Sequence, residues 1–427
     1  MMMIYLIVML LALIGLGVPI AFAMLAASMT YFLITPSLDI IVVQRMVSAL
    51  NSFPLLAVPF FVLAGTIMSR GGIAERLIGF ADVLVGHLRG GLAHVNVMNS
   101  MLIGGMSGSA SADAAIDSKV LVPIMRRKGY PNGFASALTA TSSIFAPILP
   151  PSISLVIYGV MANVSIGDLF ISGIAVGALM LVVMMVTVHI LSVRRGYAPS
   201  RDRRASLREI LEAARKSLLA LLMPVLLLVG LRMGVFTPTE LAAIAVLYAF
   251  AVAVFGYREI GWRDIPGILV ESSLTTAMIM LIVAAAGAFG LVVSYEQIPA
   301  KLQAVFDAAS VSPLAFMLII SVLLLILGAI MESLSLMIIL IPVIAPMGAS
   351  LGIDPIQLGL VLVLLFTIGG ITPPVGTITF TVCAITGCKI GEFTRAFLPF
   401  FLALLVCLFA IILFPPITTA LPRLLGH

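Results

Sequence analysis

Charged residues are scarce in this sequence. Asp, Glu, Lys and Arg make up only 10% of its 427 residues, whereas hydrophobic residues make up 62%. A soluble domain carries about 25% charged residues, so the composition excludes an ordinary water-soluble protein. Apolar stretches of about 20 residues, the length that spans a bilayer as a helix, follow one another along the chain. The sequence therefore predicts an all-α polytopic membrane protein.

Residues that bind transition metals or perform nucleophilic catalysis are also rare. The three cysteines, Cys383, Cys388 and Cys407, have neither zinc-binding nor disulfide spacing, and we interpret them as packing residues. None of the four histidines is paired with a carboxylate at ligand spacing, so no transition-metal site is expected. An intramembrane enzyme would need a nucleophile–base constellation, which the sequence lacks. Basic residues cluster in loops, which indicates membrane orientation and not binding of nucleic acid.

Two Pro-Pro pairs, Pro150-Pro151 and Pro373-Pro374, interrupt long apolar runs. Proline removes a backbone donor and clashes with the preceding helical turn, so neither run can form one regular helix. Within a bilayer such a break is tolerated only where protein or a watery cavity satisfies the freed carbonyls. Broken helices in matching positions of two halves indicate a transporter binding site. We predict broken helices at 133–160 and 356–385.

A candidate re-entrant hairpin precedes each predicted broken helix. The first, residues 92–125, centres on a run of small and polar residues at 104–113. The second, residues 313–350, centres on 328–335. The alternative for the first stretch is tight helix packing through small residues. The hairpin is favoured because the polar atoms lie in the middle of the segment, and because an intramembrane Asp113 needs a partner.

The two halves of the chain repeat one plan. The Pro-Pro pairs are 223 residues apart, and two other pairs of similar segments are 224 and 219 residues apart. We predict a first repeat at 1–193, a basic linker at 194–216 and a second repeat at 217–427. Each repeat has five crossings if a broken helix counts as one and a hairpin as none, and an odd number makes the repeat inverted. A cytoplasmic linker places most Arg and Lys on one side and both termini in the periplasm.

Hairpins that face broken helices would bring together hydroxyls, free carbonyls and helix N-termini. Oxygen cages of this kind suit Na⁺, and helix N-termini favour a substrate carboxylate. The alternative for any single Ser or Thr is a bond back to its own helix. The candidate Na⁺ ligands are Ser107, Gly108, Ser109, Ser142, Ser143, Pro147, Pro150, Glu332, Ser333, Thr367, Gly370, Thr372, Pro373 and Thr377. The candidate substrate-binding residues are Ser111, Asp113, Pro151, Ser152, Ser335, Pro374 and Gly376.

Motifs along essentially the whole chain resemble those of one known family. They are Pro59-Phe60-Phe61-Val62-Leu63-Ala64-Gly65, Gly90-Gly91-Leu92-Ala93-His94-Val95-Asn96, Ser107-Gly108-Ser109-Ala110-Ser111-Ala112-Asp113-Ala114, Leu149-Pro150-Pro151-Ser152, Phe236-Thr237-Pro238-Thr239-Glu240, Thr372-Pro373-Pro374-Val375-Gly376 and Leu398-Pro399-Phe400-Phe401. With these motifs the sequence resembles the large membrane (M) subunit of tripartite ATP-independent periplasmic (TRAP) transporters, the DctM-like family. One departure is Met331-Glu332-Ser333, where the resemblance implies an Asp after the hydrophobic residue.

The resemblance implies an elevator-type secondary transporter in the bacterial inner membrane. Its hairpins and broken helices would move against a fixed scaffold. The expected partners are a small four-helix membrane (Q) subunit and a periplasmic solute-binding protein. The expected substrate is an organic acid, such as a C4-dicarboxylate or sialic acid, with Na⁺ as the coupling ion and no cofactor. The alternative is a stand-alone ion-coupled carboxylate transporter or exporter.

Overall fold

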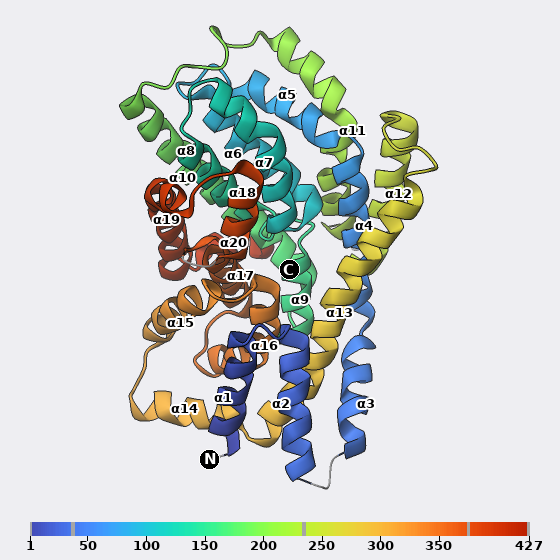
Figure 1. Ribbon diagram of the computed structural model, residues 1–427, viewed down its shortest axis with the longest axis vertical. Helices are drawn as coiled ribbons and strands as arrows, with labels where there is room; N and C mark the ends of the chain where they lie inside the picture. Colours follow the sequence, from blue (N-terminus) through green and yellow to red (C-terminus); the bar gives the residue numbers. More distant parts are fainter. Residues whose placement is uncertain (1, 36–38, 233–235, 374–375, 425–427) are drawn as a thin grey trace.

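The long apolar runs fold into helices (Figure 1). The structure, a computed structural model, describes residues 2–35, 39–232, 236–373 and 376–424, and every regular element in these ranges is helical. Up to the linker the elements are α1 (Met2–Gly15), α2 (Ile20–Ile34), α3 (Asp39–Leu50), η1 (Phe53–Leu56), α4 (Ala57–Arg70), α5 (Ile73–Val85), α6 (Gly91–Ser107), α7 (Ala110–Arg127), α8 (Asn132–Ser142), η2 (Ser143–Phe145), α9 (Ile153–Ala162) and α10 (Ile166–Arg195). After the linker they are α11 (Leu207–Arg232), α12 (Pro238–Ala251), η3 (Val252–Gly256), α13 (Ile265–Tyr295), α14 (Ile298–Ala308), α15 (Pro313–Gly328), α16 (Ser333–Ser350), α17 (Pro355–Ile371), α18 (Thr377–Thr386), α19 (Ile390–Leu413) and α20 (Pro416–Leu424).

Several helices have the length and composition of membrane spans. Within the described residues there are seven: Phe53–Arg70, Ile166–Arg195, Leu207–Leu231, Pro238–Gly256, Ile265–Tyr295, Ser333–Ser350 and Ile390–Leu413. Their number and hydropathy confirm the predicted polytopic membrane protein. The number of crossings in each repeat and the repeat boundaries stay predictions, because the structure contains no membrane.

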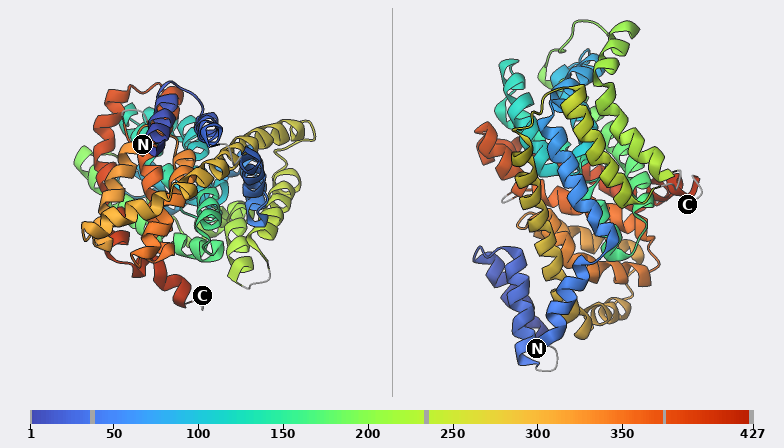
Figure 2. Two further views of the ribbon diagram at one scale, coloured as in Figure 1. Left: turned by 90° about the horizontal axis from the view of Figure 1, so that it is seen from below. Right: turned by 90° about the vertical axis from the view of Figure 1, so that its right-hand side faces the viewer.

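The outer part of the molecule is organised around α13, which is 31 residues long. It packs along its length against α2, α3 and α4, and α12 packs against α4 (Figures 1 and 2). Small residues permit this close packing. A Cβ on Gly287 of α13 would lie 2.6 Å from the Cβ of Ala49 in α3. We call α2, α3, α4, α12 and α13 the outer frame.

The inner part of the molecule interleaves the two halves of the chain. α7 packs against α18, α8 against α19, and α9 against α16. Polar contacts tie the halves together: the Tyr158 hydroxyl donates to the Pro355 carbonyl at 2.8 Å, and the Ser136 hydroxyl donates to Thr386 Oγ1 at 3.0 Å. These contacts hold helices from the two halves of the chain side by side.

The start of the basic linker is fastened to the turn between α5 and α6. The amides of Ser200 and Arg201 donate to the Gly86 carbonyl at 2.8 and 3.1 Å, and the Ser200 hydroxyl donates to Asp82 Oδ1 at 2.5 Å. The Gly90 amide donates to the Tyr197 carbonyl at 3.1 Å. The linker therefore has a defined path although it has no regular structure before α11.

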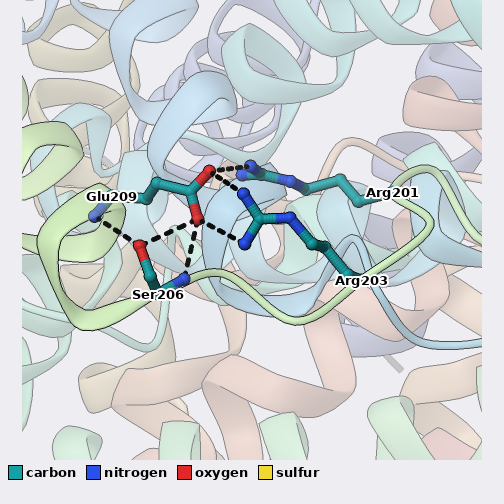
Figure 3. A network of polar contacts seen from close by, with 4 residues as sticks. All are labelled: Arg201, Arg203, Ser206 and Glu209. Carbon is teal, nitrogen blue, oxygen red and sulfur yellow. Dashed lines mark hydrogen bonds and ion pairs between the residues drawn. The ribbon is translucent and has the colours of Figure 1, made fainter.

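The end of the linker forms an N-terminal cap for α11 (Figure 3). Glu209 Oε2 accepts from the Ser206 amide at 2.7 Å, and the Glu209 amide donates back to the Ser206 hydroxyl at 3.3 Å. Such reciprocal bonds satisfy free amides at a helix start. The guanidinium groups of Arg201 and Arg203 approach Glu209 Oε1 at 3.3 and 3.2 Å. Part of the linker's positive charge is thus neutralised within it.

Candidate functional site

A cavity of about 440 Å³ lies between the outer frame and the inner helices. One side is formed by residues of α4 and α13. The other side is formed by two chain segments between helices, the first tip (residues 107–111, between α6 and α7) and the second tip (residues 329–335, between α15 and α16). Residues next to both Pro-Pro stretches complete the lining. The segments that the sequence singled out in its two halves therefore meet at one cavity.

The first tip packs directly on the first Pro-Pro stretch. Gly108 adopts a left-handed conformation, with φ at +63°, and a Cβ there would lie 2.8 Å from the Pro151 carbonyl oxygen. Only glycine combines this backbone conformation with so close an approach. Ser109 follows as the N-cap of α7, and its hydroxyl accepts from the Ala112 amide at 3.5 Å.

The first Pro-Pro stretch separates α8 and η2 from α9. The Pro150–Pro151 peptide bond is cis. The Ser152 hydroxyl donates to the Pro147 carbonyl at 2.6 Å and accepts from the Leu155 amide at 3.1 Å. One side chain therefore satisfies a carbonyl freed by the break and also caps the next helix, α9. A helix break within a membrane requires that the protein itself supplies such hydrogen bonds to the freed backbone groups.

The second tip packs on the second broken helix in the same way. A Cβ on Gly328 would lie 2.8 Å from the Gly369 Cα, and the Gly376 amide donates to the Ala329 carbonyl at 2.9 Å. Here too a hydroxyl meets a carbonyl freed by the break, because Thr379 Oγ1 donates to the Ile371 carbonyl at 2.7 Å. In both halves, therefore, a tip packs on a break.

Glu332, where the resemblance implied an Asp, is the N-cap of α16. Its Oε2 atom accepts from the Ser335 amide at 2.8 Å and from the Ser335 hydroxyl at 3.0 Å. Among the residues that the structure describes, none donates a hydrogen bond to the other carboxylate oxygen, Oε1, and Glu332 lines the cavity. The longer acid therefore both closes the helix start and brings negative charge to the cavity wall.

The structure brings some of the predicted site residues to the cavity and not others. Those that line it are Ser107, Gly108, Ser109, Ser111, Pro147, Glu332, Ser333, Ser335 and Thr367. Those that do not line it are Asp113, Ser142, Ser143, Pro150, Pro151, Ser152, Gly370, Thr372, Pro373, Gly376 and Thr377. Pro374 lies outside the described residues. The ion-binding and substrate-binding roles of all these residues stay predictions.

Several predicted hydroxyls bond back to their own helices, which is the alternative that the sequence left open. Thr367 and Thr372 donate to carbonyls four residues earlier, each at 2.7 Å, and Ser143 donates to the Ala140 carbonyl at 2.9 Å. Ser333 differs, because its hydroxyl donates at 2.9 Å to the Phe366 carbonyl of another helix, α17. Local sequence does not distinguish these two kinds of hydroxyl.

A buried polar network next to the first tip was not predicted. Asp117 is 1% exposed and accepts from Asn99 Nδ2 at 2.8 Å and from the Ser100 hydroxyl at 2.9 Å. Ser142 extends the network, with its hydroxyl 2.9 Å from Ser100 Oγ and donating to Asn96 Oδ1 at 2.8 Å. The network joins α6, α7 and α8. The spacing of Asn96, Asn99 and Ser100, which puts three polar residues on one helical face, is the sequence signal that could have found it.

Asp113 lies one turn before Asp117 in α7, yet its surroundings are different. It is fully buried, and the Ser107 side chain lies close enough to stabilise its charge, but in the described part of the chain neither carboxylate oxygen has a partner at full hydrogen-bond geometry. A buried carboxylate with so little hydrogen bonding is energetically costly. A cost of this kind points to a functional role.

The charges and dipoles around the cavity are arranged unusually. Among the residues described, two carboxylates, Glu271 and Glu332, line it, and no Lys, Arg or His does. Glu271 is at the rim, half exposed, and pairs with Arg70 outside the lining. The first turns of four helices, α7, α9, α16 and α18, also contribute to the walls. Helix N-termini attract anions, while the carboxylates attract cations.

Comparison with known proteins identifies related chains. Residues 7–417 match the family described as "Tripartite ATP-independent periplasmic transporter, DctM component". The sialic acid TRAP transporter large permease protein SiaM of Vibrio cholerae is 40% identical over 413 residues, which cover 96% of each chain. The C4-dicarboxylate TRAP transporter large permease protein DctM of Pseudomonas aeruginosa is 39% identical over 402 residues, 94% of each chain. The 2,3-diketo-L-gulonate TRAP transporter large permease protein YiaN of Escherichia coli is 36% identical over 403 residues.

A solved structure shares the fold. The YdaH transporter of Alcanivorax borkumensis matches with a TM-score of 0.60 over 87% of this chain and 86% of that chain, at 16% sequence identity. The relatives are transport permeases and not enzymes, and the resemblance drawn from the motifs is confirmed. The chain therefore belongs to the DctM family of large permease subunits of TRAP transporters, which are multi-pass proteins of the bacterial inner membrane.

Proposed function

We propose that this chain is the permease subunit of a Na⁺-coupled importer of an organic acid. The observation that carries the proposal is the cavity, where four helix N-termini and two carboxylates meet without a basic side chain in the described lining. Helix N-termini and hydroxyls can hold a substrate carboxylate. Because Glu332 lines the same space and the buried Asp113 lies beside Ser107, which also lines it, an anion needs accompanying cations there. Co-bound Na⁺ supplies them, and the coordinating oxygens come from the tips.

The same arrangement accounts for the driving force. One positive charge that crosses a potential of 100 mV contributes about 2.3 kcal/mol. Two or more Na⁺ ions per cycle would offset the charge of an anionic substrate and work against its concentration gradient. Na⁺ entering with the substrate would therefore drive uptake without ATP.

An inverted repeat and an elevator movement complete the proposal. In both halves a tip packs on a break, at Gly108 close to the Pro151 carbonyl and at Ala329, whose carbonyl accepts from the Gly376 amide, which supports a structural repeat. α1 and the linker lie at opposite ends of the long axis (Figure 1), which supports a periplasmic N-terminus and a cytoplasmic linker. The tips and broken helices are the moving part, and the outer frame is the fixed part.

The partners and the substrate class follow from the family. We propose a small four-helix membrane subunit and a periplasmic solute-binding protein as partners. Relatives are named for sialic acid, C4-dicarboxylates and 2,3-diketo-L-gulonate, all of which carry carboxylates. An organic acid that carries a carboxylate is therefore the proposed substrate.

Reconstitution in liposomes tests the proposal. We expect the chain, together with its small subunit and a solute-binding protein loaded with radiolabelled sialic acid or succinate, to accumulate at least one of them under an inward Na⁺ gradient. An equal K⁺ gradient should give background uptake. Uptake that does not depend on Na⁺ would contradict the coupling. Na⁺-driven uptake of free substrate by the chain alone would instead support the stand-alone carrier.

Removing the charge of Glu332 is expected to weaken Na⁺ activation. In Glu332→Gln the remaining carbonyl oxygen can still accept from the Ser335 amide, so the helix cap is kept while the charge is lost. The Na⁺ concentration for half-maximal uptake should rise roughly tenfold or more. The reason is that a carboxylate attracts a nearby Na⁺ strongly in a site that holds little water. Uptake assayed across a range of Na⁺ concentrations measures this change.

Glu271→Gln is the matched control. It removes the other lining carboxylate, but Glu271 is at the exposed rim and is already paired with Arg70. An exposed ion pair contributes little, so half-maximal Na⁺ should change less than about twofold. Equal effects of the two substitutions would mean that only the total negative charge of the cavity affects Na⁺ binding. Glu332 would then not mark an ion site.

A further inference from the structure

A second cavity, about 310 Å³ in volume, lies apart from the transport site. It is formed where the C-terminal end of α10 meets the N-terminal ends of α8 and α19. Its walls include Phe134, Arg195, Glu392 and Arg395, and none of the residues that line it also lines the first cavity. Both α10 and α19 have the length and composition of membrane spans. The ends of such helices lie at the level of the lipid headgroups.

The charge of this second cavity is positive. Arg195 lies with its guanidinium carbon 5.1 Å from the centre of the Phe134 ring, and neither Arg195 nor Arg395 is in an ion pair within the described residues. Glu392 is the one acid in the lining. The sequence contains no other Asp or Glu from residue 355 to the end, and none between residues 118 and 167. Exposed Lys128 and Lys389 add further positive charge in the flanking turns.

An apolar stripe leads away from the cavity along α19. Leu398, Leu402 and Val406 follow Arg395 by three, seven and eleven residues, so all four side chains lie on one face of the helix. Each of the three apolar side chains is more than half exposed. An arginine at the head of an exposed apolar stripe matches the two parts of a phospholipid, a charged headgroup and an acyl chain.

We propose that this cavity binds an anionic phospholipid, with the phosphate between Arg195 and Arg395 and an acyl chain along the α19 stripe. Guanidinium groups form strong charge-assisted bonds with phosphate oxygens. The free amides at the start of α8, which borders the cavity, also favour an anion. Basic pockets between membrane helices on the cytoplasmic side bind anionic headgroups. Such a lipid would bridge α10 to α8 and α19 and stabilise their packing.

Lipid retention by the purified full-length chain tests the proposal. After delipidation in detergent and addition of equal amounts of phosphatidylglycerol and phosphatidylcholine, native mass spectrometry should show preferential retention of phosphatidylglycerol. The Arg195→Gln/Arg395→Gln variant should lose that preference by roughly tenfold or more, since each arginine near the membrane surface contributes to anionic lipid binding. Phosphatidylglycerol should also raise the melting temperature of the wild type and not of the variant.

The control variant is Arg194→Gln/Arg204→Gln, which removes two exposed arginines that do not line the cavity. It should keep the preference, and an equal loss in both variants would overturn the site in favour of diffuse charge. Arg195 also contacts Phe134, so its loss could destabilise the fold. If the double variant has a lower melting temperature than the wild type in phosphatidylcholine, the single Arg395→Gln variant is used for the test instead. Inorganic phosphate and glycerol 3-phosphate should not stabilise the chain. If they stabilise it as well as phosphatidylglycerol does, the cavity holds a soluble anion and the lipid proposal is wrong.

Discussion

Gly108→Ala is expected to reduce substrate uptake at least about tenfold. The added Cβ would lie 2.8 Å from the Pro151 carbonyl oxygen, and this is a backbone atom that cannot rotate away. The first tip would have to move away from the break. A small displacement of binding groups lowers the rate of an enzyme strongly, and we expect it to lower the rate of transport in the same way. Uptake in liposomes, compared at equal reconstituted protein, measures the effect.

A control must show that the loss does not come merely from placing an alanine in a left-handed backbone conformation. Gly196→Ala provides the control, because Gly196 has a similar φ of +68° at the end of α10, and a Cβ there meets no atom within 4 Å. Both variants carry a strain of about 1 kcal/mol, but only the first pushes on the break. Full activity of Gly108→Ala, or the same loss in Gly196→Ala, would show that the contact between tip and break does not matter for transport.

Asp113→Ala and Asp117→Ala are expected to differ in their effect on stability although the two acids lie one turn apart. Asp117→Ala leaves Asn99 Nδ2 without its acceptor in a buried site and removes one of the two acceptors near the Ser100 hydroxyl. The unfolding free energy should fall by about 2–4 kcal/mol. Asp113→Ala removes a buried carboxylate whose oxygens have no partner at full hydrogen-bond geometry in the described part of the chain. The protein should be as stable as the wild type, or more so.

The variant with the higher stability, Asp113→Ala, is expected to be inactive in transport. Asp113→Ala is expected to abolish uptake while it keeps a high melting temperature, since residues held at a cost in stability belong to functional sites. Thermal unfolding in detergent measures stability, and Ser143→Ala, which loses only a bond to its own helix, is the control that should change it little. A stability loss in Asp113→Ala as large as in Asp117→Ala would mean that Asp113 has a structural partner.

Much of the fold was predictable because hydropathy and proline chemistry act locally. The runs that read as apolar are helical, and the chain breaks at Pro150-Pro151, between η2 and α9. α17 likewise ends at Ile371, just before the second proline pair, and α18 begins at Thr377. The tips were also recognisable, since glycine and serine in the middle of an apolar segment suit no lipid-facing helix.

The candidate site was predictable as segments but not as side chains. Ser109 and Thr372 were equal candidates by residue type, yet Ser109 lines the cavity, while Thr372 donates to its own helix and does not line it. Asp117 was not among the candidate site residues, although it accepts hydrogen bonds from two residues of α6. A hydroxyl or carboxylate on a helix can turn to its own backbone, to a neighbouring helix or to a cavity. Sequence spacing does not decide among these directions.

The sequence by itself determined that this chain is a membrane-embedded helical protein with two Pro-Pro breaks, because burial in lipid and the geometry of proline depend on residue type alone. The tertiary structure decided how the two halves meet. It packs α7 against α18 and α9 against α16, so that one cavity is bounded by tips from both halves. These contacts join residues more than 150 positions apart, and they arise from the fit of whole helix surfaces, which no local pattern encodes.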